Sequence, residues 1–264
     1  MSPLRLCSLQ SGSAGNATYI ASDTTRILID AGLALADLEA RLAAIGHKPT
    51  DLDGLLITHE HGDHVRSAGG MQRAHKVPVY LNAPTFDRAH RRLGKRFRGE
   101  IFITGEEWTI GDLVVRSYPL SHDGVETVCF RVSCGDAALA VVTDLGEPTP
   151  PVSEAISDVD LLLFEFNHDA AMLQQGRYSD ALKARIAGPY GHLSNRQAGD
   201  FLRASLTPRT RTLLLAHLSG DNNTPETALR AFHEFTAARP DLAKLEPVLT
   251  HRDAATRMLD VVVD

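Results

Sequence analysis

The sequence predicts an α/β fold in which two mixed β-sheets pack face to face and carry helices on their outer faces. Short apolar segments alternate with helical periodicity in the first and last thirds of the chain, whereas the middle third consists almost entirely of strand-like segments. No low-complexity linker or short-period repeat interrupts them. We therefore expect a single domain over residues 1–264, which is long enough to bury a substantial core.

The first third of the chain combines short strands with helices. Apolar residues recur at helical spacing from Leu35 to Ile45, and Gly46 is placed to end that helix. Another helix is predicted to begin after Arg66. The predicted strands cover residues 4–9, 18–21, 26–29, 55–57 and 77–81.

The middle third is strand-dense, and the last third alternates again. The Gly-Asp pairs at 111–112 and 135–136 suit two-residue hairpin turns. Thr224 is a suitable N-cap for the last helix. The predicted helices cover residues 195–206 and 225–238, and the strands cover 101–103, 107–110, 113–118, 125–133, 137–142, 160–166, 211–216 and, at a sheet edge, 259–263.

The chain is acidic overall but basic in one place. A formal net charge of −6 and a pI near 6.0 argue against a nucleic-acid-binding surface over the whole chain. One stretch of eleven residues departs from this average and contains Arg88, Arg91, Arg92, Lys95, Arg96 and Arg98. Two interpretations stay open for this basic stretch: a solvated helix face with its loop, or a patch that holds the phosphates of a polyanion.

Composition also bears on where the protein works. No apolar run reaches the roughly 18 residues that span a bilayer, and the first residues lack a basic segment followed by an apolar signal core. We therefore expect no membrane association and a cytoplasmic location. Cys7, Cys129 and Cys134 cannot all pair with one another, so we expect buried free thiols in a reducing compartment. The sequence does not specify an oligomeric state.

The segment His59-Glu60-His61-Gly62-Asp63-His64 carries the strongest functional signal. It follows the apolar run over residues 55–57, so its side chains leave the end of a buried strand. A turn at this point can direct His59 and His61 one way and Asp63 and His64 another, which would let one loop serve two adjacent cations. Imidazole and carboxylate ligands suit zinc, manganese or iron, and their type alone does not choose among these metals.

Further candidate ligands stand in the same context elsewhere in the chain. His122, Asp144 and His217 each follow the end of an apolar strand, as His59 does. Taken singly, each of these residues fits an ordinary loop position without a role as well as it fits a metal ligand. Residues that gather at one edge of a sheet scaffold form rigid active sites, so together with the first motif these three predict a larger metal centre.

This pattern resembles the metallo-β-lactamase superfamily over essentially the whole chain. The resemblance implies an αββα sandwich with a dinuclear metal site, in which Asp144 bridges the two metals. Asp30, in Ile29-Asp30-Ala31-Gly32, matches an early aspartate that supports the loop over residues 59–64, which we call the metal loop. The implied ligands are His59, His61 and His122 for one metal, and Asp63, His64 and His217 for the other.

Four further segments resemble the YycJ/WalJ group, which is similar to tRNase Z and to PhnP. They are Ser11-Gly12-Ser13-Ala14-Gly15-Asn16, Phe164-Glu165-Phe166-Asn167-His168-Asp169, Gly191-His192-Leu193-Ser194-Asn195 and the segment over residues 217–225. The resemblance implies a metal-dependent nuclease that degrades DNA from the 5′ end. It implies two divalent cations, Mn²⁺ or Zn²⁺ or iron, and a metal-bridging hydroxide as the nucleophile.

The same resemblance implies roles for residues outside the ligand set. Asp63, Glu165 and His192 are the implied catalytic residues, with Glu165 keeping His192 protonated so that it donates a proton to the leaving oxygen. A capping or binding role for His192 stays open. The expected substrate contacts are Ser13, Asn16, His168 and Asn222. A satisfied structural role is an equally good interpretation for His168.

Two other functions stay open at this point. The fold could serve a hydrolase of small phosphodiesters, lactones or thioesters, or a metal-stabilised regulatory protein without turnover. The Glu165/His192 pair and the Asn-rich segment after His217 favour phosphodiester chemistry and a nucleic-acid substrate, DNA in particular.

Overall fold

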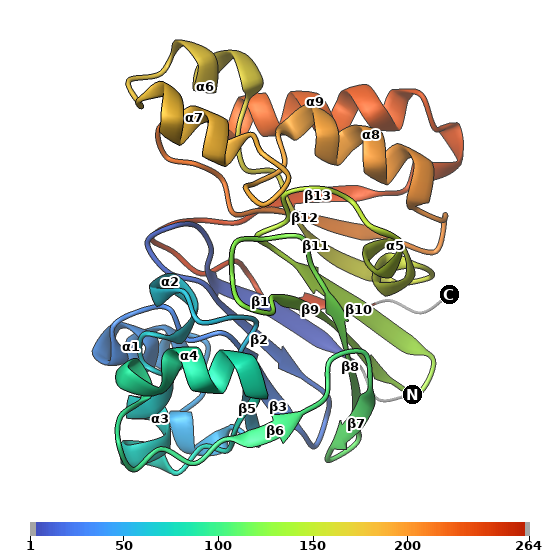
Figure 1. The fold of residues 1–264 in the computed structure, drawn as a ribbon. Helices are drawn as coiled ribbons and strands as arrows, with labels where there is room; N and C mark the ends of the chain where they lie inside the picture. Colours follow the sequence, from blue (N-terminus) through green and yellow to red (C-terminus); the bar gives the residue numbers. More distant parts are fainter. Residues whose placement is uncertain (1–3, 262–264) are drawn as a thin grey trace.

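Two seven-stranded mixed sheets form the centre of the computed structural model, which describes residues 4–261 (Figure 1). The first sheet has the order β14-β1-β2-β3-β4-β5-β6 and the second the order β13-β12-β11-β10-β9-β8-β7. In the first sheet the strands from β3 to β6 run parallel, and in the second so do those from β10 to β13. The strand bounds in the first sheet are Arg5–Gln10 (β1), Ala17–Ala21 (β2), Arg26–Ile29 (β3), Gly54–Leu56 (β4), Val79–Asn82 (β5), Glu100–Phe102 (β6) and Leu259–Asp260 (β14).

The second sheet contains the strand-dense middle of the chain and the parallel strands of the last third. Its β7–β8 and β9–β10 hairpins turn at residues 111–112 and 135–136, where Gly111 and Gly135 each have a φ of 57°, as the turn chemistry predicted. The bounds are Glu107–Ile110 (β7), Leu113–Pro119 (β8), Val128–Cys134 (β9), Ala137–Val142 (β10), Leu161–Glu165 (β11), Thr212–Ala216 (β12) and Glu246–Leu249 (β13).

Helices cover the outer face of each sheet (Figure 1). The apolar cluster outside the first sheet includes Leu38 and Leu42 of α1, and the cluster outside the second includes Leu202 of α8 and Phe232 of α9. The helix bounds are Leu35–Ala44 (α1), Gly62–Val65 (α2), Ala68–His75 (α3), Ala83–Leu93 (α4), Pro150–Ile156 (α5), Ala170–Gln175 (α6), Asp180–Ile186 (α7), Asn195–Ser205 (α8) and Pro225–Ala237 (α9), with 3₁₀ turns at Pro49–Asp51 (η1) and Pro240–Leu242 (η2).

Strand β10 shows how the layers are held together. All six of its side chains are buried, and they alternate between the two faces of its sheet. Leu139 and Val141 pack into the apolar cluster between the sheets, whereas Ala140 and Val142 pack into the cluster under α5, α8 and α9. This two-sided burial explains the continuous apolar run in the sequence. The predicted sandwich of two mixed sheets with outer helices is confirmed.

The structure also contains elements that apolar periodicity did not predict. Helices α2, α5, α6 and α7 and strand β13 are short and show little apolar repeat. Helix α4 is amphipathic, but its buried face is narrow and is formed by Thr85, Ala89 and Leu93. Helix α4 begins instead from local signals, with Pro84 in its first turn and the Asn82 side chain accepting the Thr85 amide. The last strand is confirmed at β14, while residues 262 and 263 of that prediction lie outside the described residues.

Two sequence expectations concern the protein's chemistry and surroundings. Cys7, Cys129 and Cys134 are free thiols buried within strands, as predicted. Within residues 4–261, no helix combines the length and the apolar character that a membrane crossing requires.

The topology brings the chemistry-bearing residues to one edge of the sandwich. Asp144 follows β10, Glu165 ends β11 and His217 follows β12, and these three strands are parallel neighbours. Strand β8 runs in the same direction, because it and β10 are both antiparallel to β9, so His122 after β8 reaches the same edge. In the first sheet, the loop that begins at His59 leaves β4.

Candidate metal centre

Several residues of this edge have unusual backbone conformations. Asp30, Asp144 and His217 have φ values of 63°, 60° and 56°, in the left-handed region that non-glycine residues rarely adopt. Asp30 directly follows β3, His217 directly follows β12, and Asp144 lies shortly after the end of β10. Backbone strain of this kind concentrates at functional sites, where the surrounding structure holds a side chain in a required direction.

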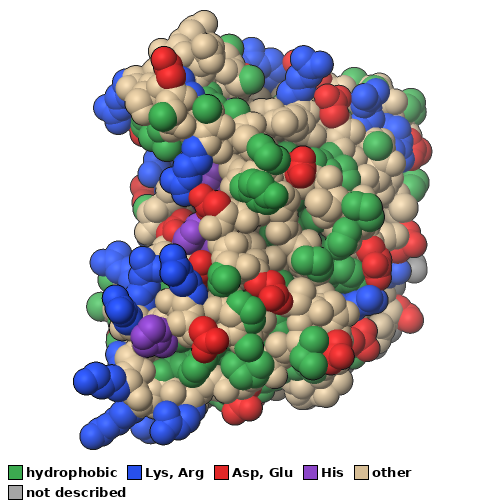
Figure 2. Space-filling view, in the orientation of Figure 1, with side chains coloured by type: hydrophobic (Ala, Val, Ile, Leu, Met, Phe, Trp, Pro, Cys, Tyr) green, Lys and Arg blue, Asp and Glu red, His purple; other side chains and the backbone are tan. Residues whose placement is uncertain are grey.

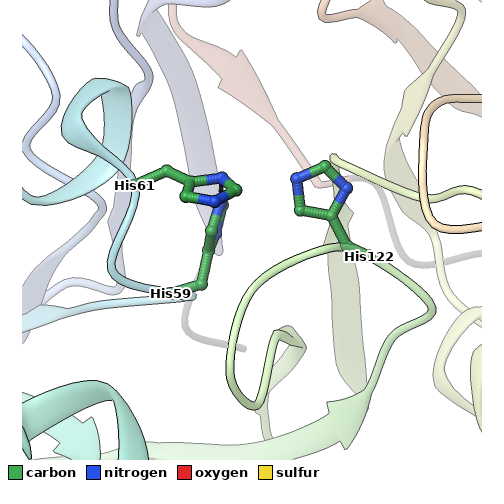
Figure 3. A group of neighbouring side chains, drawn as sticks. All are labelled: His59, His61 and His122. Atoms are coloured by element: carbon green, nitrogen blue, oxygen red, sulfur yellow. Dashed lines mark hydrogen bonds between the residues drawn. The ribbon is translucent and has the colours of Figure 1, made fainter. Parts of the chain in front are cut away.

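His59, His61 and His122 form the first group, which we call the imidazole cluster (Figure 3). His59 and His61 come from the loop after β4, and His122 reaches them from the loop after β8. One ring nitrogen from each lies within 4.8 Å of the others, and His59 Nε2 is 3.0 Å from His61 Nδ1. Three imidazoles therefore converge at one point.

Hydrogen bonds on the far side of two rings fix how they face this point. His59 Nδ1 lies 2.9 Å from Thr58 Oγ1, which directs Nε2 toward His61. His122 Nδ1 lies 3.1 Å from the Gly191 carbonyl oxygen, to which it donates, so its Nε2 faces the cluster. Partners of this kind orient metal-binding histidines in proteins.

His64 lies between this cluster and Asp144. It is fully buried; its Nδ1 donates to Asp30 Oδ2 at 2.7 Å, and its Nε2 lies 3.1 Å from Asp144 Oδ2. Asp63 Oδ2 lies 3.6 Å from the same Nε2 atom. Asp30 also accepts hydrogen bonds from the amide and hydroxyl of Thr58, so it ties the base of the metal loop to the ring of His64.

Asp144, Glu165, His192 and His217 form the last group, which we call the carboxylate cluster. Glu165 Oε1 is 2.8 Å from His192 Nδ1 and 3.1 Å from His217 Nδ1, while Asp144 Oδ1 is 3.2 Å from His217 Nδ1. The structure thus groups His217 with Glu165 and His192 as well as with Asp144. His217 lies farther from His64, with 6.3 Å between the ring centres.

The carboxylates and imidazoles of the carboxylate cluster shift one another's pKa. Burial favours the neutral form of Glu165, but His192 and His217 outweigh burial and lower the pKa of Glu165 to about 2. Burial opposes the charge on His192, but Glu165 outweighs it and raises the pKa of His192 to about 9. A carboxylate and a protonated imidazole therefore face each other here.

The imidazole cluster behaves differently. Burial, followed by the neighbouring His64, holds the pKa of His59 well below its usual range despite the opposing effect of Asp144, and burial also lowers the pKa of His122. For His64, burial is outweighed by Asp144 and Asp30, and its pKa lies well above the usual range. Neutral imidazoles with free ring nitrogens are the form that binds metal ions.

The donor set fits divalent cations. Among the described residues, His217 Nε2 is buried and has no hydrogen-bond partner, and Asp144 Oδ2 accepts none although His64 Nε2 is 3.1 Å away. Buried carboxylates need a compensating positive charge. Cations placed among these nitrogen and oxygen atoms satisfy both requirements, and such ligands suit zinc, manganese and iron.

The four expected substrate contacts lie in different surroundings. Ser13 is exposed beside the metal loop, whereas Asn16, His168 and Asn222 are buried, at 5%, 2% and 1% exposure. The Asn16 side chain accepts the Gly12 amide and lies 3.1 Å from His64 Nε2. His168 lines a cavity of about 390 Å³ between α6 and α7, and its Nδ1 has no partner among the described residues.

Sequence reasoning missed several residues beside the centre. Asp123 Oδ1 lies 3.3 Å from His122 Nε2 and 3.5 Å from His61 Nε2, and Arg185 Nε holds the other carboxylate oxygen at 2.9 Å. Glu60 is buried and accepts the Val125 amide at 3.1 Å, which joins the metal loop to the loop that carries His122. The sequence signal was their position, since Asp123 and Glu60 directly adjoin predicted ligands.

Comparison with known proteins decides the family. The family model described as the metallo-beta-lactamase superfamily matches residues 11–217. The chain belongs to this superfamily. Exodeoxyribonuclease WalJ of Streptococcus pneumoniae and exodeoxyribonuclease YycJ of Bacillus anthracis are each 36% identical to the chain, over 83% of it and over 83% and 84% of their own lengths. The resemblance to the YycJ/WalJ group is confirmed.

Solved structures share the fold at lower identity. A diphosphatase from the PhnP family covers 100% of both chains with a TM-score of 0.66 and 16% identity. The short form of human tRNase Z matches 82% of this chain and 93% of its own with a TM-score of 0.62 and 17% identity. These two structures therefore share the fold of two packed sheets with outer helices.

Proposed function

We propose that the protein is a dinuclear metal-dependent phosphodiesterase that degrades DNA as a 5′→3′ exonuclease. The observation that supports this most strongly is the His192–Glu165 pair, 2.8 Å apart, next to a set of converging metal-ligand atoms. Phosphodiester hydrolysis needs a proton donor for the leaving oxygen as well as bound cations. The names of the relatives WalJ and YycJ, both exodeoxyribonucleases, support DNA as the substrate.

In this proposal, His59, His61 and His122 hold one metal, and Asp63, His64 and His217 hold the other. Asp144 would join the two, since its Oδ1 lies 3.2 Å from His217 Nδ1 and 3.9 Å from His122 Nε2, and these residues belong to different proposed metal sites. Asp30 accepts a hydrogen bond from His64 Nδ1, which holds the proton on that nitrogen and directs Nε2 toward the cation. When bound, such a pair of cations supplies a nucleophile at neutral pH and offsets the charge of the phosphate.

The protein's own proton chemistry centres on His192. Glu165 Oε1 accepts a hydrogen bond from His192 Nδ1, and the Leu145 amide donates to the other oxygen of Glu165 at 2.6 Å. This arrangement keeps the imidazole charged and oriented. The Nε2 proton is then available to the leaving oxygen, because the His192 side chain is 21% exposed and open to a substrate.

Substrate recognition rests on the surface around the centre. Figure 2 shows Lys and Arg side chains gathered along the edge where His side chains are visible in a hollow. Every basic residue of the basic stretch is exposed, on α4 and the loop after it. We propose that this stretch attracts the phosphate backbone of DNA electrostatically, and that Ser13 contacts the bound DNA strand.

The test is hydrolysis by the purified protein supplied with Mn²⁺ or Zn²⁺. We expect stepwise release of nucleotides from the 5′ end of duplex DNA, and inhibition by a chelator. Substrates labelled at the 5′ or the 3′ end distinguish the direction of degradation, and matched RNA distinguishes the sugar.

Other outcomes select the other functions. Cleavage of bis-p-nitrophenyl phosphate without any DNA cleavage would favour a hydrolase of small phosphodiesters. Turnover of lactones or thioesters alone would favour the wider hydrolase chemistry. Retained metal with no turnover of any of these substrates would favour a regulatory protein.

A further inference from the structure

A second cavity lies directly beside the metal loop. Its volume is about 470 Å³, within the range of sites that hold a small ligand or a substrate fragment. Four parts of the chain meet there: the loop after β1, the loop after β3 at Gly32, the metal loop with α2, and α4. The residues that the cavity offers to a ligand are Ser13, Ala14, Gly62, Asp63, Arg66 and Arg92.

The charge of this cavity is positive apart from one metal-loop residue. Arg66 and Arg92 are both exposed, and the single carboxylate that lines the cavity is Asp63. Because Asp63 is a proposed metal ligand, its charge is directed to the cations. The two guanidinium groups are therefore left to attract an anion from solvent, and guanidinium suits phosphate by its planar fork of donors.

Arg92 is also fixed in place. Its Nη1 donates to the carbonyl oxygen of Glu60, 2.6 Å away, which attaches this α4 side chain to the metal loop. An arginine has five N–H donors, so others remain for a ligand. This contact distinguishes Arg92 from its neighbours in the basic stretch, which are exposed but do not line the cavity.

The loop after β1 contributes backbone donors. The amides of Gly12, Gly15 and Asn16 are occupied, by Asn16 Oδ1, the Gly12 carbonyl and the Asp63 carbonyl respectively. Within residues 4–261, no acceptor receives the amides of Ser13 and Ala14. The loop is thus held rigidly while two N–H groups stay available at the cavity wall, as in backbone sites that bind anions.

We propose that this cavity binds a second phosphate of the DNA strand, distinct from the one that is cleaved, through Arg66, Arg92 and the amides of Ser13 and Ala14. This rests on the proposed function, since the cleaved phosphate occupies the metal centre. Arg66 and Arg92 then act as specificity residues, because a nucleic-acid strand offers a second phosphate and a small diester does not.

The test compares Arg66→Gln/Arg92→Gln with the control Arg230→Gln/Lys244→Gln, which removes the same charge from exposed positions outside both the cavity and the basic stretch. The readout is kcat/KM for DNA divided by kcat/KM for bis-p-nitrophenyl phosphate, with metal content measured for each protein. We expect this ratio to fall about 10- to 100-fold in the cavity variant and less than about 3-fold in the control. Equal losses in the two variants, or no loss in the cavity variant, would overturn the proposal.

Two further comparisons complete the design. A loss confined to 5′-phosphorylated DNA identifies the second phosphate as the terminal one, whereas equal loss on 5′-hydroxyl DNA identifies an internal one. If the unmodified protein cleaves no DNA, fluorescence anisotropy of a labelled oligonucleotide replaces turnover. Weaker binding by the cavity variant alone then supports the cavity while the nuclease proposal fails, and equal binding by all three proteins rejects the cavity.

Discussion

The imidazole cluster and the carboxylate cluster lie side by side but differ in chemistry. The first contains His59, His61 and His122 alone, whereas the second adds two buried carboxylates to its histidines. Burial lowers the pKa of His59 and of His122 in the first, and Glu165 outweighs burial and raises the pKa of His192 in the second. The difference indicates that one cluster is suited to binding a cation, and the other to binding a cation and moving a proton.

The largest effect is expected where the two halves of the centre meet, at Asp144. Asp144→Asn removes the carboxylate that lies 3.2 Å from His217 and 3.9 Å from His122, which belong to different proposed metal sites, so we expect loss of bound metal and at least a roughly 1,000-fold loss of kcat/KM. Metal analysis and phosphodiester hydrolysis measure these. Asp158→Asn is the matched control, because Asp158 shares the left-handed backbone with a φ of 49° but takes no part in the clusters. Normal metal content in Asp144→Asn would disprove the bridging position.

The second prediction distinguishes the two clusters by the effect that a substitution in each has on metal content and on kcat. His192→Ala is expected to lower kcat by about 100- to 10,000-fold with metal content near normal, because it removes the proposed proton donor. His122→Ala is expected to lose metal, because it removes a ring of the imidazole cluster. The measurement is metal content and kcat side by side. Loss of metal from His192→Ala would instead make His192 a ligand, which its place in the carboxylate cluster permits.

The third prediction concerns Asp30, which contacts His64 on Nδ1, the ring nitrogen that is not assigned to the metal. Asp30→Asn keeps a side chain that tolerates the left-handed backbone but weakens the charged contact to His64 Nδ1, now 2.7 Å long. We expect metal affinity to fall about 10- to 100-fold, as for other partners of metal ligands. Competition with a chelator measures the affinity. Asp53→Asn is the control, since the Asp53 carboxylate accepts the Arg26 amide at the ends of β3 and β4 that lie opposite to Asp30 and the ligands.

The smallest effect is expected in the pH profile. Glu165 outweighs burial and raises the pKa of His192 to about 9, so the imidazole holds its proton below that pH and loses it above. Glu165→Gln removes the raising charge, and the alkaline limb of kcat should therefore move to lower pH. Glu60→Gln is the control, because Glu60 contacts the Val125 amide instead of His192. An unmoved alkaline limb in Glu165→Gln would separate His192 from the rate-limiting proton transfer.

Much of the fold followed from the sequence because central strands such as β10 are apolar on two faces, and because glycine-containing turns bound others such as β7. Residues 26–29, 107–110 and 137–142 were predicted with the bounds that the structure has, and Thr224 caps α9 by accepting the Thr227 amide. Helix α4 was missed because its buried face, formed by Thr85, Ala89 and Leu93, is a narrow stripe in a mostly polar segment. The strand predicted at 125–133 begins at Val128, because the residues before it belong to the loop that Glu60 holds.

The sequence by itself determined the kind of chemistry. His59, His122, Asp144 and His217 stand at or shortly after strand ends, and residue type and position relative to a strand are local properties. Only the tertiary structure decided which of them meet. It placed Glu165 against both His192 and His217, and it brought Arg66 and Arg92 into one cavity from segments that no local pattern connects. Such distances depend on how the two sheets and their loops pack, because residues far apart in sequence become neighbours only through the packed core.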